Sequence, residues 1–202
     1  MTKTTPKQDY HVGNLSPQLL TAARQILETV GPAKLSLRAV SKQVGVSSAA
    51  AYHHFPNRLD LVAHVAAQGF RELGRALGKI DLDLDKQSII KQSLLAYYTF
   101  ARSNPKMYQL MFGEELSGSQ GNTTFTKARD EAFNQLVTGV ARAINEPPED
   151  SATITVAVSL WAYAHGLTSM VIQGAIVPSA AATDEHFVNK LFDGISSVLR
   201  DI

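Results

Sequence analysis

The sequence contains no cysteine. This absence excludes disulfide frameworks, zinc sites with cysteine ligands, iron–sulfur clusters and catalysis by a thiolate, although it fixes no compartment. Charged residues are few, at 18%, while the hydrophobic fraction of 45% is ordinary for a globular chain. Because a disordered chain combines low hydrophobicity with high net charge, this composition argues against global disorder.

Net charge is also nearly missing, since the formal value is only +1, and this total favours no class of partner. The charge is unevenly distributed along the chain. Residues 1–60 hold seven Lys or Arg and three acids, a formal charge of +4, whereas residues 61–202 hold 12 Lys or Arg and 15 acids, or −3. A basic first third and a slightly acidic remainder indicate two functions in one chain.

No segment shows the two-residue alternation of a strand. Apolar residues recur at helical spacing instead, between capping residues and Gly, Pro or Asn stops, which predicts an all-α fold of about nine helices. The expected helices cover residues 16–30, 36–44, 47–55, 57–79, 86–103, 105–112, 122–144, 151–173 and 184–200, with a flexible loop at 113–121. The expected organisation is a flexible N-terminal tail at 1–15 without a secretion signal, a first helical domain at 16–65 and a second helical domain at 66–202.

The most informative stretch is residues 36–55, in which two short predicted helices flank Gly45. A glycine there supplies the positive φ that turns one helix across the other, as in a helix-turn-helix motif. Ser47 can cap the second helix, and the small residues after it would let that helix approach a major groove closely. Donors for DNA phosphates follow at Tyr52, His53, His54 and Arg58. The same pattern also fits a helical hairpin in a bundle.

Residues 16–65 resemble the DNA-binding domain of the tetracycline-repressor (TetR) family. The resemblance rests on Gly31, Ser36, Gly45-Val46-Ser47, Tyr52-His53-His54-Phe55 and Arg58, which agree with the family pattern without gaps. It implies a DNA-binding transcriptional regulator, most often a repressor, that binds a palindromic operator in double-stranded DNA as a homodimer. It also implies which residues contact DNA. Those that would reach base edges or nearby phosphates are Arg38, Ser47, Ser48, Ala49 and Ala50. Those that would mainly bind phosphates are Tyr52, His53, His54 and Arg58.

Three residues depart from the family pattern. Ala50 stands where many relatives carry Thr, Ala51 replaces a common Leu, and Ser41 replaces a usual Ala. These changes leave little side-chain chemistry on the second helix. Base recognition is therefore expected to rest on Arg38, Ser48 and apolar contacts to thymine methyl groups. The alternative function is a helical ligand-binding or interaction module with weak or no DNA binding.

The segment 151–183 is the longest run without a charged residue. Its Ser, Thr, His, Gln, Gly and Pro residues favour a helix buried by protein over a membrane span. Two apolar stripes on this helix predict burial on both sides, by its own domain and by a partner molecule. The family resemblance assigns the partner side to a homodimer interface with the last helix, formed by Val156, Leu160, Tyr163, Leu167, Phe187, Leu191, Phe192, Ile195 and Val198. We expect no membrane partner and a cytoplasmic location.

Segments 107–113 and 161–166 resemble a C-terminal subgroup of the family, often called WHG regulators. The family resemblance implies that residues 66–202 are an effector-binding and dimerisation domain. It also implies an unidentified small-molecule effector that enters this C-terminal domain and shifts the fourth helix. Aromatic and Met residues there are typical of any core, but they are also the candidates for an effector pocket. These candidates are Tyr97, Phe100, Met107, Tyr108, Met111, Phe125, Phe133, Trp161, His165 and Met170.

An enzyme is the main rival function. Glu114-Glu115 and six His residues invite a metal or acid–base site, yet no His-x-x-x-His or Glu-x-x-His pair occurs. No glycine-rich phosphate loop follows a strand, because no strand is expected. The sequence therefore predicts no catalytic residues, no metal site and no cofactor.

Overall fold

The computed structural model describes residues 15–117, 121–180 and 182–199. Of the predicted tail at 1–15, only Leu15 falls within the described part, where it begins the first helix. Of the loop predicted at 113–121, residues 118–120 lie outside the described residues. The side chain of Val198, predicted for the dimer interface, is outside it as well.

The described residues form nine α-helices and two short 3-10 turns, with no strand among them, so the all-α prediction is confirmed. The elements are α1 Leu15–Val30, η2 Pro32–Lys34, α2 Leu37–Val44, α3 Ser48–His54, α4 Arg58–Leu77, α5 Lys86–Ser103, α6 Pro105–Met111, η3 Glu114–Leu116, α7 Thr123–Ile144, α8 Ser151–Ile172 and α9 Asp184–Leu199. The turn η3 lies inside the segment predicted to be a loop.

Helix starts follow the capping chemistry that the sequence indicates. The side-chain oxygens of Ser36, Ser47 and Asn57 accept hydrogen bonds from the backbone N–H groups of Ala39, Ala50 and Asp60. Each bond satisfies one of the donors left free in the first turn of a helix. The capping residues themselves are non-helical, which is why α2, α3 and α4 begin one residue after each of them.

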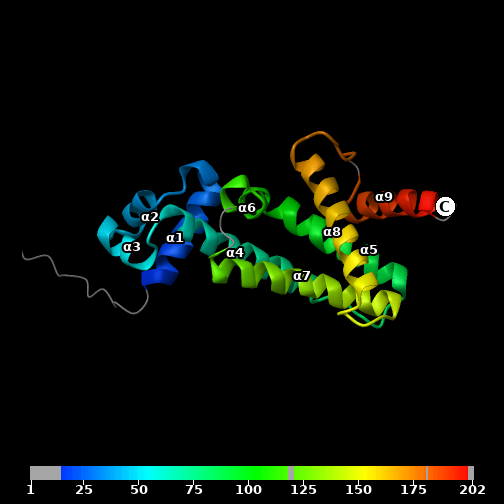
Figure 1. Ribbon diagram of the computed structural model, residues 1–202. Coiled ribbons are helices and arrows are strands. Elements are labelled where there is room, and N and C mark those ends of the chain that lie inside the picture. Colours follow the sequence, from blue (N-terminus) through cyan, green and yellow to red (C-terminus); the bar gives the residue numbers. More distant parts are fainter. Residues whose placement is uncertain (1–14, 118–120, 181, 200–202) are drawn as a thin grey trace, which may run out of the picture.

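The molecule is elongated, with α1, α2 and α3 at one end and α8 and α9 at the other (Figure 1). Helix α4 runs from the first end into the body and crosses the predicted domain boundary at residues 65 and 66. It lies alongside α7 (Figure 1). A Cβ atom on Gly74 would lie 3.3 Å from the Cα of Ala132, so the two helices approach closely because neither residue carries a long side chain.

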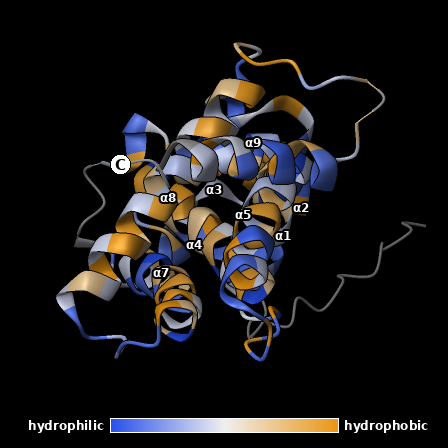
Figure 2. Ribbon diagram, turned by 90° about the vertical axis from the view of Figure 1, so that its right-hand side faces the viewer, coloured by the Kyte–Doolittle hydropathy of each residue, from blue (hydrophilic) through white to orange (hydrophobic). Residues whose placement is uncertain are grey.

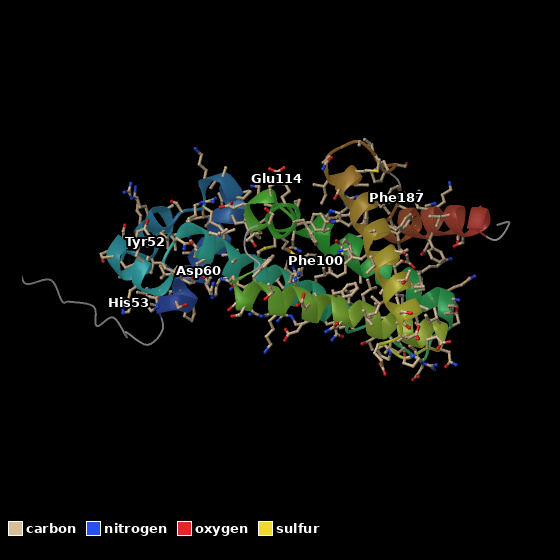
Figure 3. The ribbon with its side chains drawn as sticks, viewed as in Figure 1. Tyr52, His53, Asp60, Phe100, Glu114 and Phe187 are labelled. Carbon is tan, nitrogen blue, oxygen red and sulfur yellow. The ribbon has the colours of Figure 1, made fainter. Side chains whose placement is uncertain are left out.

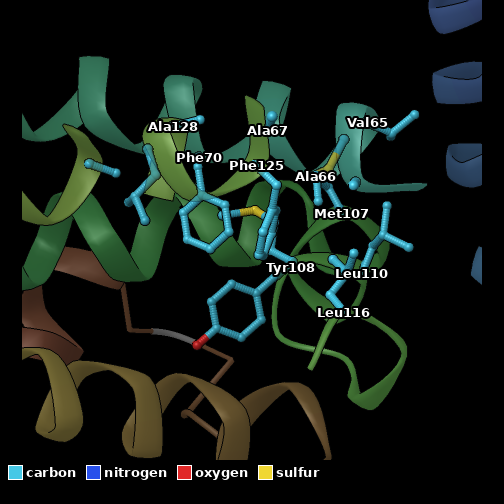
Figure 4. Close-up of a cluster of buried hydrophobic side chains, with 14 of the residues drawn as sticks. Val65, Ala66, Ala67, Phe70, Met107, Tyr108, Leu110, Leu116, Phe125 and Ala128 are labelled. Carbon is cyan, nitrogen blue, oxygen red and sulfur yellow. The ribbon is translucent and has the colours of Figure 1, made fainter. Parts of the chain in front are cut away.

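The core continues from the first end into the body along one face of α4. Aromatic and Met side chains of neighbouring elements pack against this face (Figure 4). Phe70 meets the rings of Phe112 and Phe125 edge-on, with centroid distances of 5.4 and 5.7 Å. Met107 and Met111 lie so close to Gly69 that a Cβ there would be 2.8 and 2.5 Å from their atoms. Glycine at this position therefore lets α6 dock on α4.

Helix α8 differs from its sequence-based prediction. The line of residues that it buries consists of small side chains, Thr153, Ala157, Ala164 and Thr168, because these let α8 pack closely on α5 and α7. Neither predicted apolar stripe is buried as a whole, and apolar colour runs along the helix (Figure 2). Large side chains of both stripes stay exposed: Ile154, Val156, Val158 and Met170. Burial on both sides is thus not achieved within one chain.

By length and composition, α8 is one helix among the described residues that could cross a membrane. One such helix is weak evidence, since helices of soluble proteins pass the same test. The inward-facing Thr and Ala line instead fits packing against protein.

Candidate functional site

Helices α2 and α3 form the helix-turn-helix arrangement that the sequence predicts. Gly45 lies between them with φ 80° and ψ 28°, the left-handed region that favours glycine. Its N–H and that of Val46 donate to the carbonyl of Ser41 at 2.9 and 3.0 Å, which closes α2. Ala51 and Phe55 are fully buried beneath α3, which packs on α2 and α1. The opposite side of α3 is left for solvent.

The predicted DNA-contacting residues lie together at this end of the molecule. Tyr52 is 49% exposed, and both Tyr52 and His53 lie at the tip of the first end (Figure 3). His53 and His54 stack on each other, with ring centroids 5.7 Å apart. Arg38, Ser47, Ala49, Tyr52, His53 and His54 are exposed, while Ser48 and Ala50 are half-buried. The exposed set offers cationic and hydroxyl donors around a narrow, mostly aliphatic helix.

Arg58 is placed differently from the other predicted phosphate contacts. Its Nε donates to the carbonyl of Leu35 at 2.6 Å, its Nη2 donates to the carbonyl of Pro32 at 2.9 Å, and its Nη1 pairs with Glu115 of η3. The guanidinium therefore holds η2 and the start of α2 on α4. A phosphate contact by Arg58 would require its pair with Glu115 to open.

Two further links join the helix-turn-helix end to the body. Asn122, the N-cap of α7, donates from Nδ2 to Oδ1 of Asp60 at 2.7 Å. Asp60 lies in the first turn of α4. On α1, Arg24 forms a two-pronged pair with Glu72 of α4, at 2.6 and 3.0 Å, and reaches Asn104 at 3.3 Å. Polar side chains thus join α1 and the start of α4 to the helices of the body.

A second set of chemically active groups lies inside the body. Tyr97, Tyr108 and His165 come from α5, α6 and α8, and their polar atoms converge. The Tyr108 hydroxyl lies 2.6 Å from His165 Nδ1, and the Tyr97 hydroxyl lies 3.2 Å from that of Tyr108. Burial lowers the pKa of His165 and raises the pKa of both tyrosines. All three groups are therefore neutral at pH 7.

The neutral imidazole carries one hydrogen, and the ring nitrogen that holds it sets the direction of this hydrogen-bond chain. With the hydrogen on Nε2, the Tyr108 hydroxyl donates to Nδ1, and with the hydrogen on Nδ1, the imidazole donates to Tyr108. The other ring nitrogen, Nε2, lies 3.5 Å from Ser169 Oγ.

His165 borders a cavity of about 230 Å³ between α6 and α8. The lining residues are Tyr108, Gln109, Phe112, His165, Ser169, Ile172 and Gln173. None of them carries a formal charge at pH 7. Among the described residues, no group of three His, Asp or Glu side chains gathers closely enough to hold a metal ion.

Only Tyr108 and His165 of the predicted effector residues line this cavity. Trp161 and Phe133 are half-buried neighbours with ring centroids 5.3 Å apart, and Met170 is 49% exposed. The others are core residues packed among α4, α5, α6 and α7: Tyr97, Phe100, Met107, Met111 and Phe125.

Sequence reasoning missed the polar half of the lining, Gln109, Ser169 and Gln173, as well as Phe112. A search for aromatic and Met residues could not find amide and hydroxyl side chains. Their signal would have been position: Ser169 lies one turn after His165 on the same helix face.

The predicted dimer residues lie on α8 and α9, at the end remote from α3 (Figure 1). Val156 and Ile195 are exposed, and the rest of the described set is half-buried: Leu160, Tyr163, Leu167, Phe187, Leu191 and Phe192. Phe187 contacts Tyr98 of α5, with ring centroids 5.6 Å apart, so part of α9 belongs to the body of its own chain.

Fold and site together define a class: an all-α protein with a helix-turn-helix head and a helical body that holds a small, uncharged cavity. Two family models match the chain. Residues 19–65 match the tetR family of bacterial regulatory proteins, and residues 90–193 match the tetracyclin repressor-like C-terminal domain. The chain belongs to the tetR family, which confirms the family resemblance.

Similar proteins add detail at lower identity. The nucleoid occlusion factor SlmA of Marinomonas sp. (strain MWYL1) is 29% identical over 134 residues, which are 64% of this chain and 65% of SlmA. The match thus spans slightly less than two thirds of that relative. A protein of unknown function from Rhodococcus sp. RHA1 is 26% identical, with a TM-score of 0.74 over 93% of this chain and 96% of that one.

A third relative is BioQ bound to its natural double-stranded DNA operator. It is 23% identical, with a TM-score of 0.60 over 88% of this chain and 95% of BioQ. At this identity the likeness shows a shared fold.

Proposed function

We propose that this protein is a cytoplasmic transcriptional regulator, without enzymatic activity, that represses by binding a palindromic operator as a homodimer and leaves it when a small effector binds. The observation that carries the proposal is the solvent-facing side of α3, where Tyr52, His53 and His54 are exposed beside an N-terminus capped by Ser47. A capped helix N-terminus and aromatic or imidazole donors suit phosphate contacts that fix a helix in a major groove.

The direct test is fluorescence anisotropy with labelled DNA from the region upstream of the chain's own gene. We expect a palindromic fragment to bind, with an affinity that falls steeply as salt rises, because binding releases counterions from the phosphates. Intact dimer that binds no such fragment at low salt would contradict the proposal and favour the helical interaction module.

The phosphate assignment is tested with Tyr52→Ala combined with His54→Ala. We expect the double variant to weaken operator binding by about tenfold or more, since two donors are lost. His186→Ala is the control, because His186 is also exposed but lies on α9 at the other end. Equal affinity of the double variant and the parent protein would show that these side chains do not contact DNA.

The dimer proposal is supported by apolar side chains that α8 leaves exposed. Val156 is 39% exposed in the single chain, next to Val158 at 52%. An apolar surface of this kind is typical of a protein interface. We expect Val156→Glu to convert dimer to monomer in sedimentation analysis, because a carboxylate would be buried there without a partner. Val30→Glu, at a position that is 56% exposed on α1, should leave the dimer intact.

The effector proposal is supported by the cavity beside His165. An uncharged lining with amide, hydroxyl and imidazole groups suits a small neutral ligand, because no charged side chain is present to compensate an ion. Benzamide, benzoate and benzamidine have the same shape and carry different charges, and Trp161, the only tryptophan, reports nearby binding by its fluorescence. We expect a response to benzamide that Ser169→Val abolishes and that Ser159→Val, on the exposed side of α8, retains. A stronger response to either ion would contradict the assignment.

A further inference from the structure

Three exposed cations are spaced four residues apart at the C-terminal end of α4. Arg71 and Arg75 lie on the helix, and Lys79 follows its C-cap, Gly78. Arg75 follows Arg71 by about 6 Å along the helix axis. Within the described residues none of the three forms an ion pair or a side-chain hydrogen bond. Like charges at this spacing on a helix repel each other.

The same three side chains line a cleft with a volume of about 610 Å³. Its other wall is α7, and its floor is made of small residues, Gly74 and Gly78 of α4 and Ala132 of α7. Glu131 is the one carboxylate in the cleft, so three positive charges face one negative charge. This cleft shares no lining residue with the cavity beside His165.

Arg71 and Arg75 also line a neighbouring cleft of about 440 Å³ on the side of α1. The acid in that cleft, Glu72, is already held by both prongs of Arg24. The guanidinium groups of Arg71 and Arg75 therefore lie between two clefts, and neither forms an ion pair among the described residues. Both groups are placed to bind a ligand in the larger cleft.

From this arrangement we propose that the cleft between α4 and α7 binds a small molecule that carries two or more neighbouring phosphate groups. Guanidinium groups bind phosphate oxygens in a two-pronged manner, and a row of cations matches a chain of phosphates better than a single anion. The small-residue floor leaves room for a flat organic group next to the phosphates. The cleft lies at the C-terminal part of α4, which runs away from α3 into the body (Figure 1), so we assign it an occupant other than operator DNA.

The test is isothermal titration calorimetry on the full chain without DNA, using tripolyphosphate, ATP, adenosine and citrate as probes. We expect tripolyphosphate and ATP to bind and adenosine to give no heat, with binding that weakens as salt rises. Tighter binding of ATP would identify a nucleotide as the ligand class, and equal binding would identify the polyphosphate alone. Citrate binding as tight as tripolyphosphate, or no binding of either phosphate compound at about 1 mM, would overturn the proposal.

Variants locate the site. Arg71→Gln with Arg75→Gln should weaken tripolyphosphate binding by about tenfold, because two charge-assisted contacts are lost. The control is Lys86→Gln with Lys190→Gln, which removes the same charge from exposed positions on α5 and α9 and should change affinity less than about twofold. Equal losses in the two pairs would overturn the site by showing a general charge effect.

A third variant changes binding in the opposite direction. Glu131→Gln removes the one carboxylate of the cleft and should tighten tripolyphosphate binding by about twofold to threefold. Unchanged or weaker binding by this variant would overturn the site. Since no DNA is present in these titrations, their failure would leave the operator proposal untouched.

Discussion

The pair between Arg24 and Glu72 is the strongest polar link between α1 and α4, and its removal gives a quantitative prediction. Nη1 and Nη2 of Arg24 bind the two carboxylate oxygens of Glu72 at 2.6 and 3.0 Å. The Arg24 side chain is 19% exposed and that of Glu72 is 30% exposed, so the pair lies between a surface pair and a buried one.

The magnitude follows from this intermediate burial. Hydrogen bonds to charged groups contribute about 1.5–3 kcal/mol when screened from water, whereas exposed pairs contribute about 0.2–1 kcal/mol. We therefore expect a coupling free energy of about 1–1.5 kcal/mol. Arg24→Ala should cost about 2 kcal/mol of unfolding free energy, since Glu72 is left unpaired and the packing of the Arg24 stem on α1 and α4 is also lost.

The assay is a double-mutant cycle of Arg24→Ala and Glu72→Gln by urea denaturation, at one protein concentration because a dimer unfolds in a concentration-dependent way. Arg71→Ala is the control, since Arg71 is exposed and has no ion pair among the described residues, and it should cost less than about 0.5 kcal/mol. A coupling below about 0.3 kcal/mol, or equal costs for Arg24→Ala and Arg71→Ala, would refute this reasoning.

Three other predictions concern the turn, the cap and the buried imidazole. Gly45→Ala should cost about 1 kcal/mol of unfolding free energy in urea, because φ is 80° at this position. Gly121→Ala is the control and should leave the unfolding free energy unchanged, because φ is not positive there and a Cβ would have no atom within 4 Å. Ser47→Ala should cost about 1 kcal/mol of unfolding free energy and weaken operator binding, because the N–H of Ala50 loses its acceptor; unchanged values in both assays would contradict the capping argument. Burial lowers the pKa of His165, so the unfolded chain takes up a proton at higher pH than the folded one. Stability from this group is complete above the unfolded pKa of about 6.5 and is lost as pH falls from there toward the folded pKa. We expect His165→Gln to flatten this acid-side fall in unfolding free energy, and a parallel fall in the variant would show that another group causes it.

The local features of this protein were decided by the sequence. Ser36, Ser47 and Asn57 could be identified as N-caps because a capping side chain bonds to an N–H only three residues ahead. Gly45 could be identified as the turn because few other residues adopt its φ. An N-cap or a tight turn involves only a few consecutive residues, so the amino-acid sequence alone is nearly sufficient to predict it.

The direction of long side chains was decided by the tertiary structure. Arg58 was predicted to contact phosphate, yet its guanidinium binds Pro32, Leu35 and Glu115, which come together only after folding. Tyr97, Tyr108 and His165 lie up to 68 residues apart in sequence, and their hydrogen-bond chain exists because α5, α6 and α8 meet.

The lack of charge was visible in the sequence, but its physical meaning required the fold. A charge-free α8 predicts burial, and the structure shows that its small residues face the body, namely Thr153, Ala157, Ala164 and Thr168. Several larger apolar residues are exposed instead: Ile154, Val156, Val158 and Met170. Arg71, Arg75 and Lys79 were ordinary members of a slightly acidic region until α7 came to lie beside them and formed a cleft with one acid. Composition counts charges, but only packing determines which of them face each other without a partner.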